Sequence, residues 1–372
     1  MQLDDPSGAS SATKLAAYKA VGTLYNALMT SLVLGLVTRR GEDTAREYVF
    51  RHFRRQHLEK FLAGLQKLGL ADQPDAPACA LYHYHSNALG GVKTGYLRES
   101  DRKAWVRYPP PRWIWRGTAI AAVPHSVSAA MLHGWHGHNG VSLGNKGLGF
   151  VCTGMTVDGM PGLEGYYFDY GRPIEEHERV RFAYGTEEMP RVDWAAQPRL
   201  ETANWPEERR LKTFRAYAVE YLRTMLPTLQ DLLGPDDAQK ELGRVARLVG
   251  LQFHEEMARE MDLPTDVERG DFASARDFAR WLSNILRAEG EEIETTERDG
   301  AVVVTATGWR AVRELTLADP LKAFDAWNEL WLGAAAAHDR FLTVQTTCSL
   351  GERGWSIAWT IGPRANAIRQ HA

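Results

Sequence analysis

Two short segments, Gly41–Ala45 (GEDTA) and Gly234–Ala238 (GPDDA), each open a long stretch with apolar residues at helical spacing. The stretches run to Leu70 and Leu263 and align at a constant offset of 193 residues. Further segments align at offsets of 192 to 194, namely 134–136 with 326–328, 150–153 with 344–347, and 163–168 with 355–360. Separated blocks at nearly one offset predict an internal duplication.

The hydrophobic periodicity predicts an α+β fold of two tandem pseudo-repeats, each a helical portion followed by a small antiparallel sheet. In the first half it predicts helices over 15–37, 43–68 and 123–135, strands over 81–85 and 103–108, and a hairpin of 147–155 with 162–170 turning at Asp158-Gly159. The second helix carries its apolar face on Tyr48, Phe53, Leu58, Phe61, Leu62 and Leu65. The second half predicts helices over 211–233, 238–261, 273–289 and 321–337, a strand over 301–307, and a hairpin of 341–349 with 355–361.

These elements divide the chain into five parts. Residues 1–13 form a lead-in, 14–170 the first repeat with the candidate active site, 171–209 a linker, 210–363 a mainly structural second repeat, and 364–372 a tail. The linker is rich in charge and proline, which disfavours regular structure.

The composition excludes several classes of protein. The 372 residues are 44% hydrophobic and 24% charged with a net charge of −3, which excludes disordered, collagen-like and strongly basic nucleic-acid-binding chains. Three cysteines, an odd number, predict a reducing compartment, and the polar N-terminus lacks a signal peptide, so we expect a cytoplasmic protein. Residues 20–38 are uncharged and near membrane-spanning length, yet their polar members favour a buried helix, so no membrane partner is expected.

The histidines are distributed unevenly. Seven of the twelve lie between His83 and His177, whereas residues 327–331 (WNELW), which correspond to the block around His136, contain none. His83 and His85 share one face of the predicted strand, and His133, His136 and His138 gather at the end of a predicted helix.

Three roles for these imidazoles stay open. His133, His136 and His138 could hold a divalent transition metal, although their spacing matches no H-E-x-x-H motif. His136 or His138 could instead act as a general base without metal, since an ordinary imidazole titrates near neutral pH. They could also be hydrogen-bonded structural groups.

Two residues of the predicted hairpin are further catalytic candidates. Cys152 could act as a nucleophile if His136 or His138 generated its thiolate, and otherwise is a small buried side chain. Glu164 stands between two glycines on an aromatic strand, which suits an acid/base or a metal ligand, and otherwise faces solvent from an edge strand. No G-x-G-x-x-G joins a strand to a helix, so no nucleotide cofactor is expected.

Arginines and aromatic residues alternate between positions 98 and 116. Arg107 and Arg112 could pair with a substrate carboxylate, while Trp113, Trp135 and Tyr166 could form the walls of a pocket for a planar group. The alternatives are stacking of single-stranded nucleic acid, which the net charge disfavours, and packing of the tryptophans over the core.

The C-terminal pattern resembles a known family. A helix with Trp327-Asn328-Glu329, then residues 344–352 (VQTTCSLGE) and the aromatic strand 355–359 (WSIAW), is similar to the L-2-amino-thiazoline-4-carboxylic acid hydrolase-like family. More distantly it resembles vinyl-reductase-type small-molecule-binding domains. Gly354 or Trp355 stands where the family has a cysteine after the hairpin turn. The resemblance covers about residues 210–362 and implies a cytoplasmic α+β enzyme that opens a small ring containing a C–N bond or a related carboxylated compound.

Together these observations predict a hydrolase of a small planar, carboxylated heterocycle, with His136, His138, Glu164 and Cys152 as catalytic candidates. A lyase acting on a similar substrate, a non-catalytic small-molecule sensor or carrier, and an oligomerisation scaffold are the alternatives. The long apolar helices are compatible with a homodimer.

Overall fold

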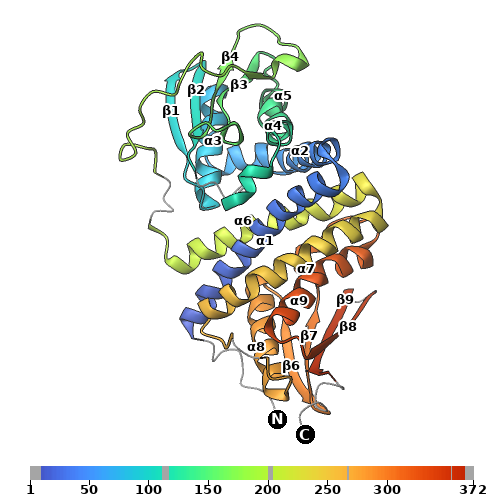
Figure 1. Ribbon diagram of the computed structural model, residues 1–372. Helices are drawn as coiled ribbons and strands as arrows, with labels where there is room; N and C mark the ends of the chain where they lie inside the picture. Colours follow the sequence, from blue (N-terminus) through green and yellow to red (C-terminus); the bar gives the residue numbers. More distant parts are fainter. Residues whose placement is uncertain (1–9, 111–116, 200–203, 266–267, 353, 365–372) are drawn as a thin grey trace. The chain divides into compact units, whose positions relative to one another are not determined.

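The computed structural model describes residues 10–110, 117–199, 204–265, 268–352 and 354–364 (Figure 1). The predicted α+β class is confirmed, with helices followed by a sheet in each half. The chain forms two compact units. The first unit is Val33–Pro206, and the second unit combines the residues up to Leu32 with those from Glu207 onward. This division differs from the predicted repeats, because the first predicted helix lies largely in the second unit.

In the described residues, the first unit contains the part of α1 that follows Leu32, four further α-helices and a five-stranded sheet. Its helices are α1 (Ser11–Arg40, shared with the second unit), α2 (Glu42–Lys67), α3 (Asp75–Leu89), α4 (His125–Gly134) and α5 (Asn139–Leu143). Its strands are β1 (Gly95–Ser100), β2 (Lys103–Tyr108), β3 (Leu148–Gly154), β4 (Leu163–Asp169) and β5 (Val180–Phe182), in the order β1-β2-β4-β3-β5. Helix α3 packs against β1, β2 and β4, and α4 packs against α2 (Figure 1).

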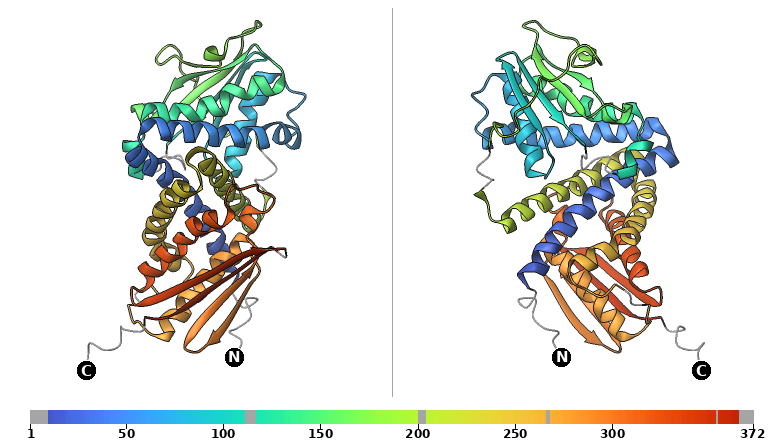
Figure 2. Two further views of the ribbon diagram at one scale, coloured as in Figure 1. Left: turned by 90° about the vertical axis from the view of Figure 1, so that its right-hand side faces the viewer. Right: turned by 60° about the vertical axis from the view of Figure 1, so that its left-hand side comes forward.

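The second unit repeats this plan, with longer helices in place of α3 and α4. Its helices are α6 (Glu207–Leu233), α7 (Pro235–Glu260), α8 (Phe272–Glu289) and α9 (Pro320–His338), and its strands are β6 (Ile293–Arg298), β7 (Ala301–Thr307), β8 (Leu342–Gly351) and β9 (Gly354–Pro363). The strand order β6-β7-β9-β8 is antiparallel throughout and matches β1-β2-β4-β3 of the first unit. Helices α8 and α9 pack on the sheet (Figure 2).

One glycine separates the two long helices in each half. Gly41 stands between α1 and α2 with φ 87°, and Gly234 stands between α6 and α7 with φ 78°. A positive φ is easily reached only by glycine, which explains why glycine stands at both positions. The aligned segments 41–45 and 234–238 therefore begin with the same backbone geometry.

Three predictions about local structure are wrong. Residues 81–85 were predicted as a strand but lie in α3. In this helix Tyr82 packs edge-on against Phe61 of α2, with 5.1 Å between the ring centres. An alternating pattern of only five residues cannot distinguish a strand from a helix. The predicted linker 171–209 contains β5, which pairs in parallel with β3 and completes the first sheet. On α2, Leu58 and Leu62 are 66% and 48% exposed.

Helix α1 is long and apolar enough to cross a membrane by length and composition alone. Within the structure, 67% of its most apolar 18-residue window is buried, as in the core helix of a globular protein. Tyr25 of this helix is held by the second unit, since its hydroxyl donates to Glu289 Oε1 at 2.6 Å and accepts from Trp327 Nε1 at 2.8 Å.

Candidate functional site

Buried polar and aromatic side chains meet between the helices and the sheet of the first unit. We call this group the histidine cluster; it consists of His57, Tyr82, His83, Tyr108, Trp135, His136, Asn139 and Tyr167. All are at most 5% exposed except Trp135, which is half-buried. Polar groups are rarely buried without hydrogen-bond partners, so the pairing of each one is informative.

Local structure brings these residues together. Tyr82 and His83 lie on the inward stripe of α3, three and four residues after the buried Cys79. On β4 the alternation of a strand directs Leu163, Gly165 and Tyr167 to the same inner face. His136 begins the single 3₁₀ turn His136–His138 that links α4 to α5, which places its ring against Phe150 and Tyr167.

Three rings form a flat stack at the centre of the cluster. The rings of His83 and His136 lie 4.1 Å apart and 9° from parallel. The Tyr167 ring is 5.9 Å from each, within 11° of parallel to His83 and 5° to His136. Two imidazoles this close cannot both carry a positive charge without strong repulsion, so the stack favours neutral rings.

Hydrogen bonds fix the orientation of these rings. The Asn139 Nδ2 group donates to the Tyr167 hydroxyl at 3.0 Å and lies 3.3 Å from His83 Nε2, which therefore accepts. The Tyr108 hydroxyl lies 3.5 Å from His136 Nε2. Burial, together with the neighbouring His57, lowers the pKa of His83 to about 3, so this ring is neutral at physiological pH.

The proton of His57 can be placed from its partner. Arg54 Nη1 lies 2.7 Å from His57 Nδ1, and a guanidinium only donates, so Nδ1 accepts and Nε2 carries the hydrogen. Burial and the charge of Arg54 lower the pKa of His57 to about 3. The Asn139 side chain is a hydrogen-bond neighbour of His57 that acts in the opposite direction and raises this pKa, although Asn139 Oδ1 and His57 Nε2 do not meet strict hydrogen-bond geometry.

His57 Nε2, Trp135 Nε1 and Asn139 Oδ1 are buried and form no hydrogen bond of good geometry with the described residues. The first two are donors and the third is an acceptor. Their side chains are neighbours, since the His57 and Trp135 rings lie 5.8 Å apart at 88°. Tyr82 stacks on Trp135 with 6.2 Å between ring centres, so the unpaired groups sit beside flat aromatic surfaces.

The three histidines predicted to hold a metal do not converge. His136 faces the sheet, His133 is exposed beside Phe182, and His138 lies beside Phe50 with its Nδ1 2.8 Å from the His133 carbonyl oxygen. Throughout the described ranges, no group of three His, Cys, Asp or Glu side chains is arranged to hold a metal ion. The predicted pairing of His83 with His85 on one strand face is also wrong, because both lie on a helix.

Glu164 and Arg107 lie on the other face of the sheet. Strand β4 is an inner strand, and Glu164, three residues before Tyr167, faces away from the cluster. Its Oε2 lies 3.4 Å from Arg107 Nε, and its Oε1 accepts from the Met189 backbone at 2.7 Å. The predicted acid/base pair of Glu164 with His136 therefore cannot act on one atom, and Arg107 already has a carboxylate partner.

The other predicted residues make contacts with groups outside the cluster. Tyr166 packs on Trp105 of the outer face, with 4.6 Å between ring centres. Cys152 is fully buried, donates to the Gly154 carbonyl oxygen at 3.3 Å and lies beside Tyr184. Arg112 and Trp113 lie outside the described residues. Of the predicted substrate-binding residues, Trp135 is the one that the structure places in the cluster.

Sequence reasoning missed His57, Tyr82, Asn139 and Tyr167. A signal was present for His57, which stands four residues before Phe61 on the inward stripe of α2, where an imidazole is unusual. Asn139 gave no signal, because its role depends on contacts with residues 56 and 28 positions away in the chain.

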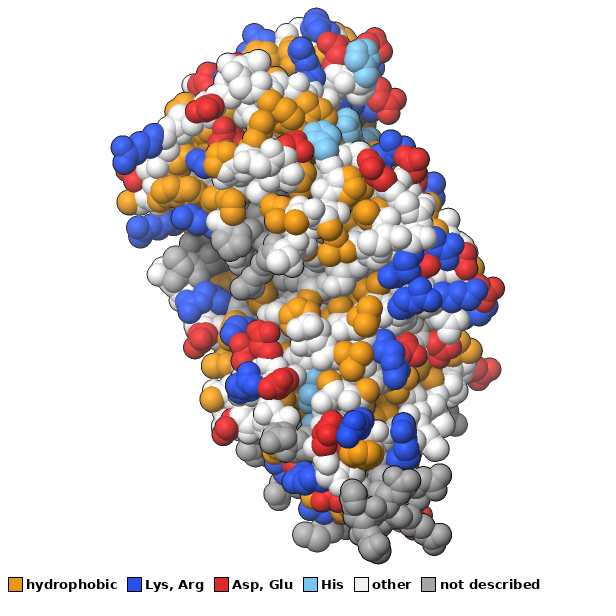
Figure 3. All heavy atoms as spheres, in the orientation of Figure 1, with side chains coloured by type: hydrophobic (Ala, Val, Ile, Leu, Met, Phe, Trp, Pro, Cys, Tyr) orange, Lys and Arg blue, Asp and Glu red, His pale blue; other side chains and the backbone are white. Residues whose placement is uncertain are grey.

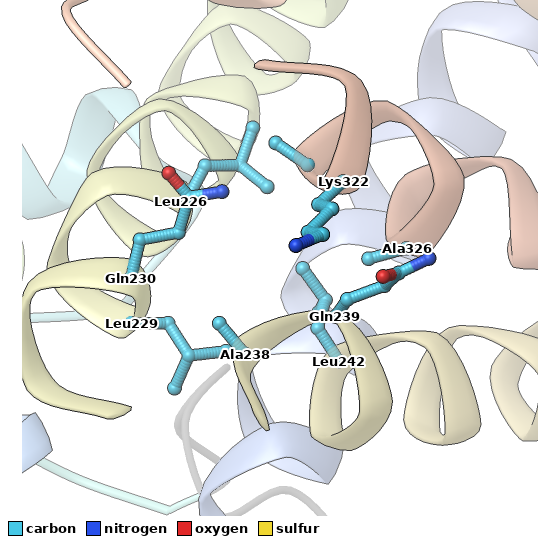
Figure 4. Close-up of a pocket in the computed structure, with 9 residues that line it drawn as sticks. Leu226, Leu229, Gln230, Ala238, Gln239, Leu242, Lys322 and Ala326 are labelled. Carbon is cyan, nitrogen blue, oxygen red and sulfur yellow. The ribbon is translucent and has the colours of Figure 1, made fainter. Parts of the chain in front are cut away.

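A pocket in the second unit lies between α6, α7 and α9 (Figure 4). It offers about 10 Å³, room for about one water molecule. Its polar groups have partners: Gln230 Nε2 donates to the Asp319 carbonyl oxygen at 2.7 Å, and Lys322 pairs with Asp236 at 2.7 Å. Acidic and basic side chains are interspersed on the surface drawn in Figure 3. Neither feature competes with the histidine cluster as a candidate site.

No protein-family model, curated protein or solved structure matches the chain.

Proposed function

We propose that the first unit binds a small, planar, uncharged heterocycle in the histidine cluster, as a sensor or carrier. One observation carries the proposal: His57 Nε2, Trp135 Nε1 and Asn139 Oδ1 are buried and form no hydrogen bond of good geometry with the described residues. An unpaired buried polar group costs about 1–3 kcal/mol, so a ligand that pairs all three gains affinity.

The chemistry of the three groups indicates the class of ligand. Two N–H donors and one carbonyl acceptor complement a molecule that presents two acceptors and one donor, as a cyclic amide or imide does. The flat faces of Tyr82 and Trp135 suit a planar ring. The sequence favoured a carboxylated ligand, but Arg107 is paired with Glu164 on the outer face, so we propose an uncharged one.

Binding without reaction is favoured over hydrolysis by the state of the imidazoles. A general base works best with a pKa near the ambient pH, whereas burial lowers the pKa of His57 and His83 to about 3 and also lowers the pKa of His138, one of the two predicted bases. Ring opening, expected from the sequence and from the family resemblance, remains a prediction that the same experiment tests.

The experiment uses the full chain and hydantoin, a neutral five-membered ring with two carbonyls and two N–H groups. Binding is followed by the indole N–H resonances of ¹⁵N-labelled tryptophan, assigned by single Trp→Phe substitutions. We expect the Trp135 resonance to shift with added hydantoin. The Trp135→Phe variant should bind on the order of tenfold more weakly at this site. Because this variant lacks the reporting indole, its binding is followed through the Tyr167 ring in protein that also carries isotope-labelled tyrosine.

Trp105→Phe is the matched control, because the indole of Trp105 is buried in the same unit but already donates to Glu99 Oε2 at 2.8 Å. It should leave affinity unchanged. Equal loss in both variants, or no shift with hydantoin, succinimide or uracil at millimolar concentration, contradicts the proposal. A ring-opened product one water heavier by mass spectrometry would establish hydrolysis instead.

A further inference from the structure

The sheets of the two units differ at one edge. In the first unit β3 is paired on its outer side with β5. The Phe150 N–H donates to the Arg179 carbonyl oxygen at 2.9 Å. The Ala183 N–H donates to the Cys152 carbonyl oxygen, also at 2.9 Å. In the second unit the corresponding strand, β8, is the last of its sheet, and no strand of the described ranges pairs with its outer side (Figure 1).

The ladder between β8 and β9 identifies the backbone groups that point outward from this edge. Just before β8, the Phe341 carbonyl oxygen accepts from the Arg364 N–H at 2.7 Å, so Phe341 is directed toward the β9 side. Backbone groups of an antiparallel strand alternate in direction from one residue to the next. The N–H and C=O groups of Val344, Thr346 and Cys348 therefore point away from β9, where no described strand pairs with them. The first two of these positions align with the two β3 residues that bind β5.

The other edges of the two sheets carry features that oppose pairing with another chain. Charged side chains, irregular register and short length all have this effect. Strand β1 has an irregular register after Arg98, β5 has three residues, and β6 carries Glu294, Glu297 and Arg298. Strand β8 has ten residues (LTVQTTCSLG) with no charge, no proline and a continuous register with β9. It is therefore the edge best suited to accept a further strand.

The sequence of β8 is complementary to itself in the antiparallel orientation. When Thr346 of two copies is placed opposite itself, apolar residues face apolar ones and polar residues face polar ones, in the pairs Leu342–Leu350, Val344–Cys348, Thr343–Ser349 and Gln345–Thr347. Just beyond the strand, the exposed Arg340 comes opposite the exposed Glu352 of the other copy, and the symmetry repeats this pair at the other end. Opposite charges and matched side chains across two strands are both favourable.

We propose that two copies of the chain associate through β8, antiparallel about Thr346, and join their four-stranded sheets into one continuous sheet. The outward N–H and C=O groups of Val344, Thr346 and Cys348 then bond with those of the second copy. A pairing about a two-fold axis uses the same edge of both copies, so the assembly stops at a dimer. The inference uses residues of the second unit alone and does not depend on the ligand proposed for the first.

Sedimentation of the full chain at micromolar concentration should give twice the chain mass. The variant Gln345→Lys/Thr347→Lys places like charges directly opposite each other and should weaken the dimer on the order of tenfold. The variant Gln345→Lys/Thr347→Glu makes the same positions complementary and should restore the dimer. Both positions are exposed, and Thr296→Lys, at an exposed position of β6, is the control that should leave the dimer unchanged.

Cysteine pairing tests the register in a Cys348→Ser background, in which the two remaining native cysteines are buried. Thr343 and Ser349 of opposite copies form a pair without mutual hydrogen bonds, with Cα atoms about 4.5 Å apart and within range of a disulfide. A mixture of Thr343→Cys and Ser349→Cys proteins should therefore give a disulfide-linked dimer on oxidation. In either protein alone the two cysteines lie about 20 Å apart, so neither should cross-link with itself.

The proposal is overturned if the chain stays monomeric at hundreds of micromolar. It is also overturned if the dimer is unaffected by Gln345→Lys/Thr347→Lys, which would place the contact on another surface, or if single-cysteine proteins cross-link with themselves in preference to the mixture.

If a variant fails to fold, as judged by circular dichroism, amide exchange of the wild type decides the matter. On dilution the N–H groups of Thr346 and Cys348 should exchange faster, whereas those of Gln345 and Thr347, directed toward β9, should stay protected. Equal behaviour of the two sets on dilution would overturn the proposal.

Discussion

The two units share one order of helices and strands but differ in the residue that stands at one position where a pair of helices meets. At the offset of 193 residues, His57 of α2 corresponds to Gly250 of α7. A Cβ atom at Gly250 would overlap the backbone of α9 at Leu330, so glycine lets the two backbones touch there. In the first unit the same position carries an imidazole between the helices.

The polar groups of the second unit lie one helical turn further along. His254 follows Gly250 by four residues, and its counterpart in the first unit is Phe61. Both units nevertheless bury indole and imidazole nitrogens that form no hydrogen bond with the described residues and that lie beside aromatic rings. The comparison teaches that the duplicated fold tolerates a shift of such polar groups by one helical turn.

The largest expected difference between the units is their response to pH. Burial lowers the pKa of His52, His57 and His83 in the first unit to about 3, and that of His254 in the second to about 3. The unfolded chain takes up these protons below pH 6.5, so stability is full above 6.5 and falls as the pH drops toward 3. At pH 5 each of these histidines lowers the free energy of unfolding by about 2 kcal/mol. The three in the first unit together lower it by about 6 kcal/mol, and the one in the second unit lowers it by about 2 kcal/mol.

At alkaline pH the second unit should lose more stability than the first. Burial raises the pKa of Glu289 in the second unit to about 8, so its contribution is full below pH 4.5 and is lost as the pH rises through 8. Hydrogen exchange of peptides from α3 and α8, measured from pH 5 to 9 and corrected for the intrinsic rate, separates the units. Glu289→Gln should remove the alkaline loss in α8; parallel pH profiles in the two units would contradict the prediction.

The next largest effect tests the helix contacts. Gly250→Ala places a methyl group into the α9 backbone and should lower the free energy of unfolding by about 3 kcal/mol. Gly134→Ala should act similarly in the first unit, because its Cβ would lie 2.5 Å from the Phe50 carbonyl oxygen of α2. Gly351→Ala has nothing within 4 Å and serves as the control in urea unfolding. A cost below 1 kcal/mol at Gly250 would show that α7 and α9 can separate.

Periodicity predicted the elements with strong local patterns and failed where tertiary contacts decide. The spacing of apolar residues gave β2 and β7 at their observed bounds. It gave α1, α2, α4 and α6 to α9 to within four residues at each end. It misjudged residues 81–85, where Leu81, His83 and His85 alternate like a strand but α3 packs through Tyr82 and His83. The three residues of β5 are too few for any pattern, and their pairing depends on β3.

The candidate site was less predictable than the fold. The sequence located the histidine-rich half and Trp135, but it grouped His133, His136 and His138 by closeness in the chain. A tight turn sends these rings in different directions, whereas His83 and His136, 53 positions apart, stack at 4.1 Å. The second unit was expected to be structural because residues 327–331 lack histidine, yet its imidazoles come from α7 and the end of α9.

A smaller effect distinguishes unpaired from paired indoles by stability alone. Trp359→Phe leaves the buried Asn328 Oδ1 without its indole donor, whereas Trp331→Phe breaks no described hydrogen bond. Both lose a similar apolar area, so Trp359→Phe should cost about 1 kcal/mol more in urea unfolding. An equal cost would mean that the Trp331 N–H is already paired in solution, for example with water.

The smallest effect concerns matched surface positions of the two long helices. Leu58 of α2 and Leu251 of α7 correspond at the offset of 193 and are 66% and 40% exposed. Neither side chain is buried within its unit, so Leu58→Lys and Leu251→Lys should each change the free energy of unfolding by less than about 0.5 kcal/mol. Phe61→Lys, at a fully buried position of α2, is the control and should unfold the first unit. A loss above 1 kcal/mol for one leucine alone would mean that its helix face is covered in solution, and concentration-dependent unfolding would assign that cover to a second copy of the chain.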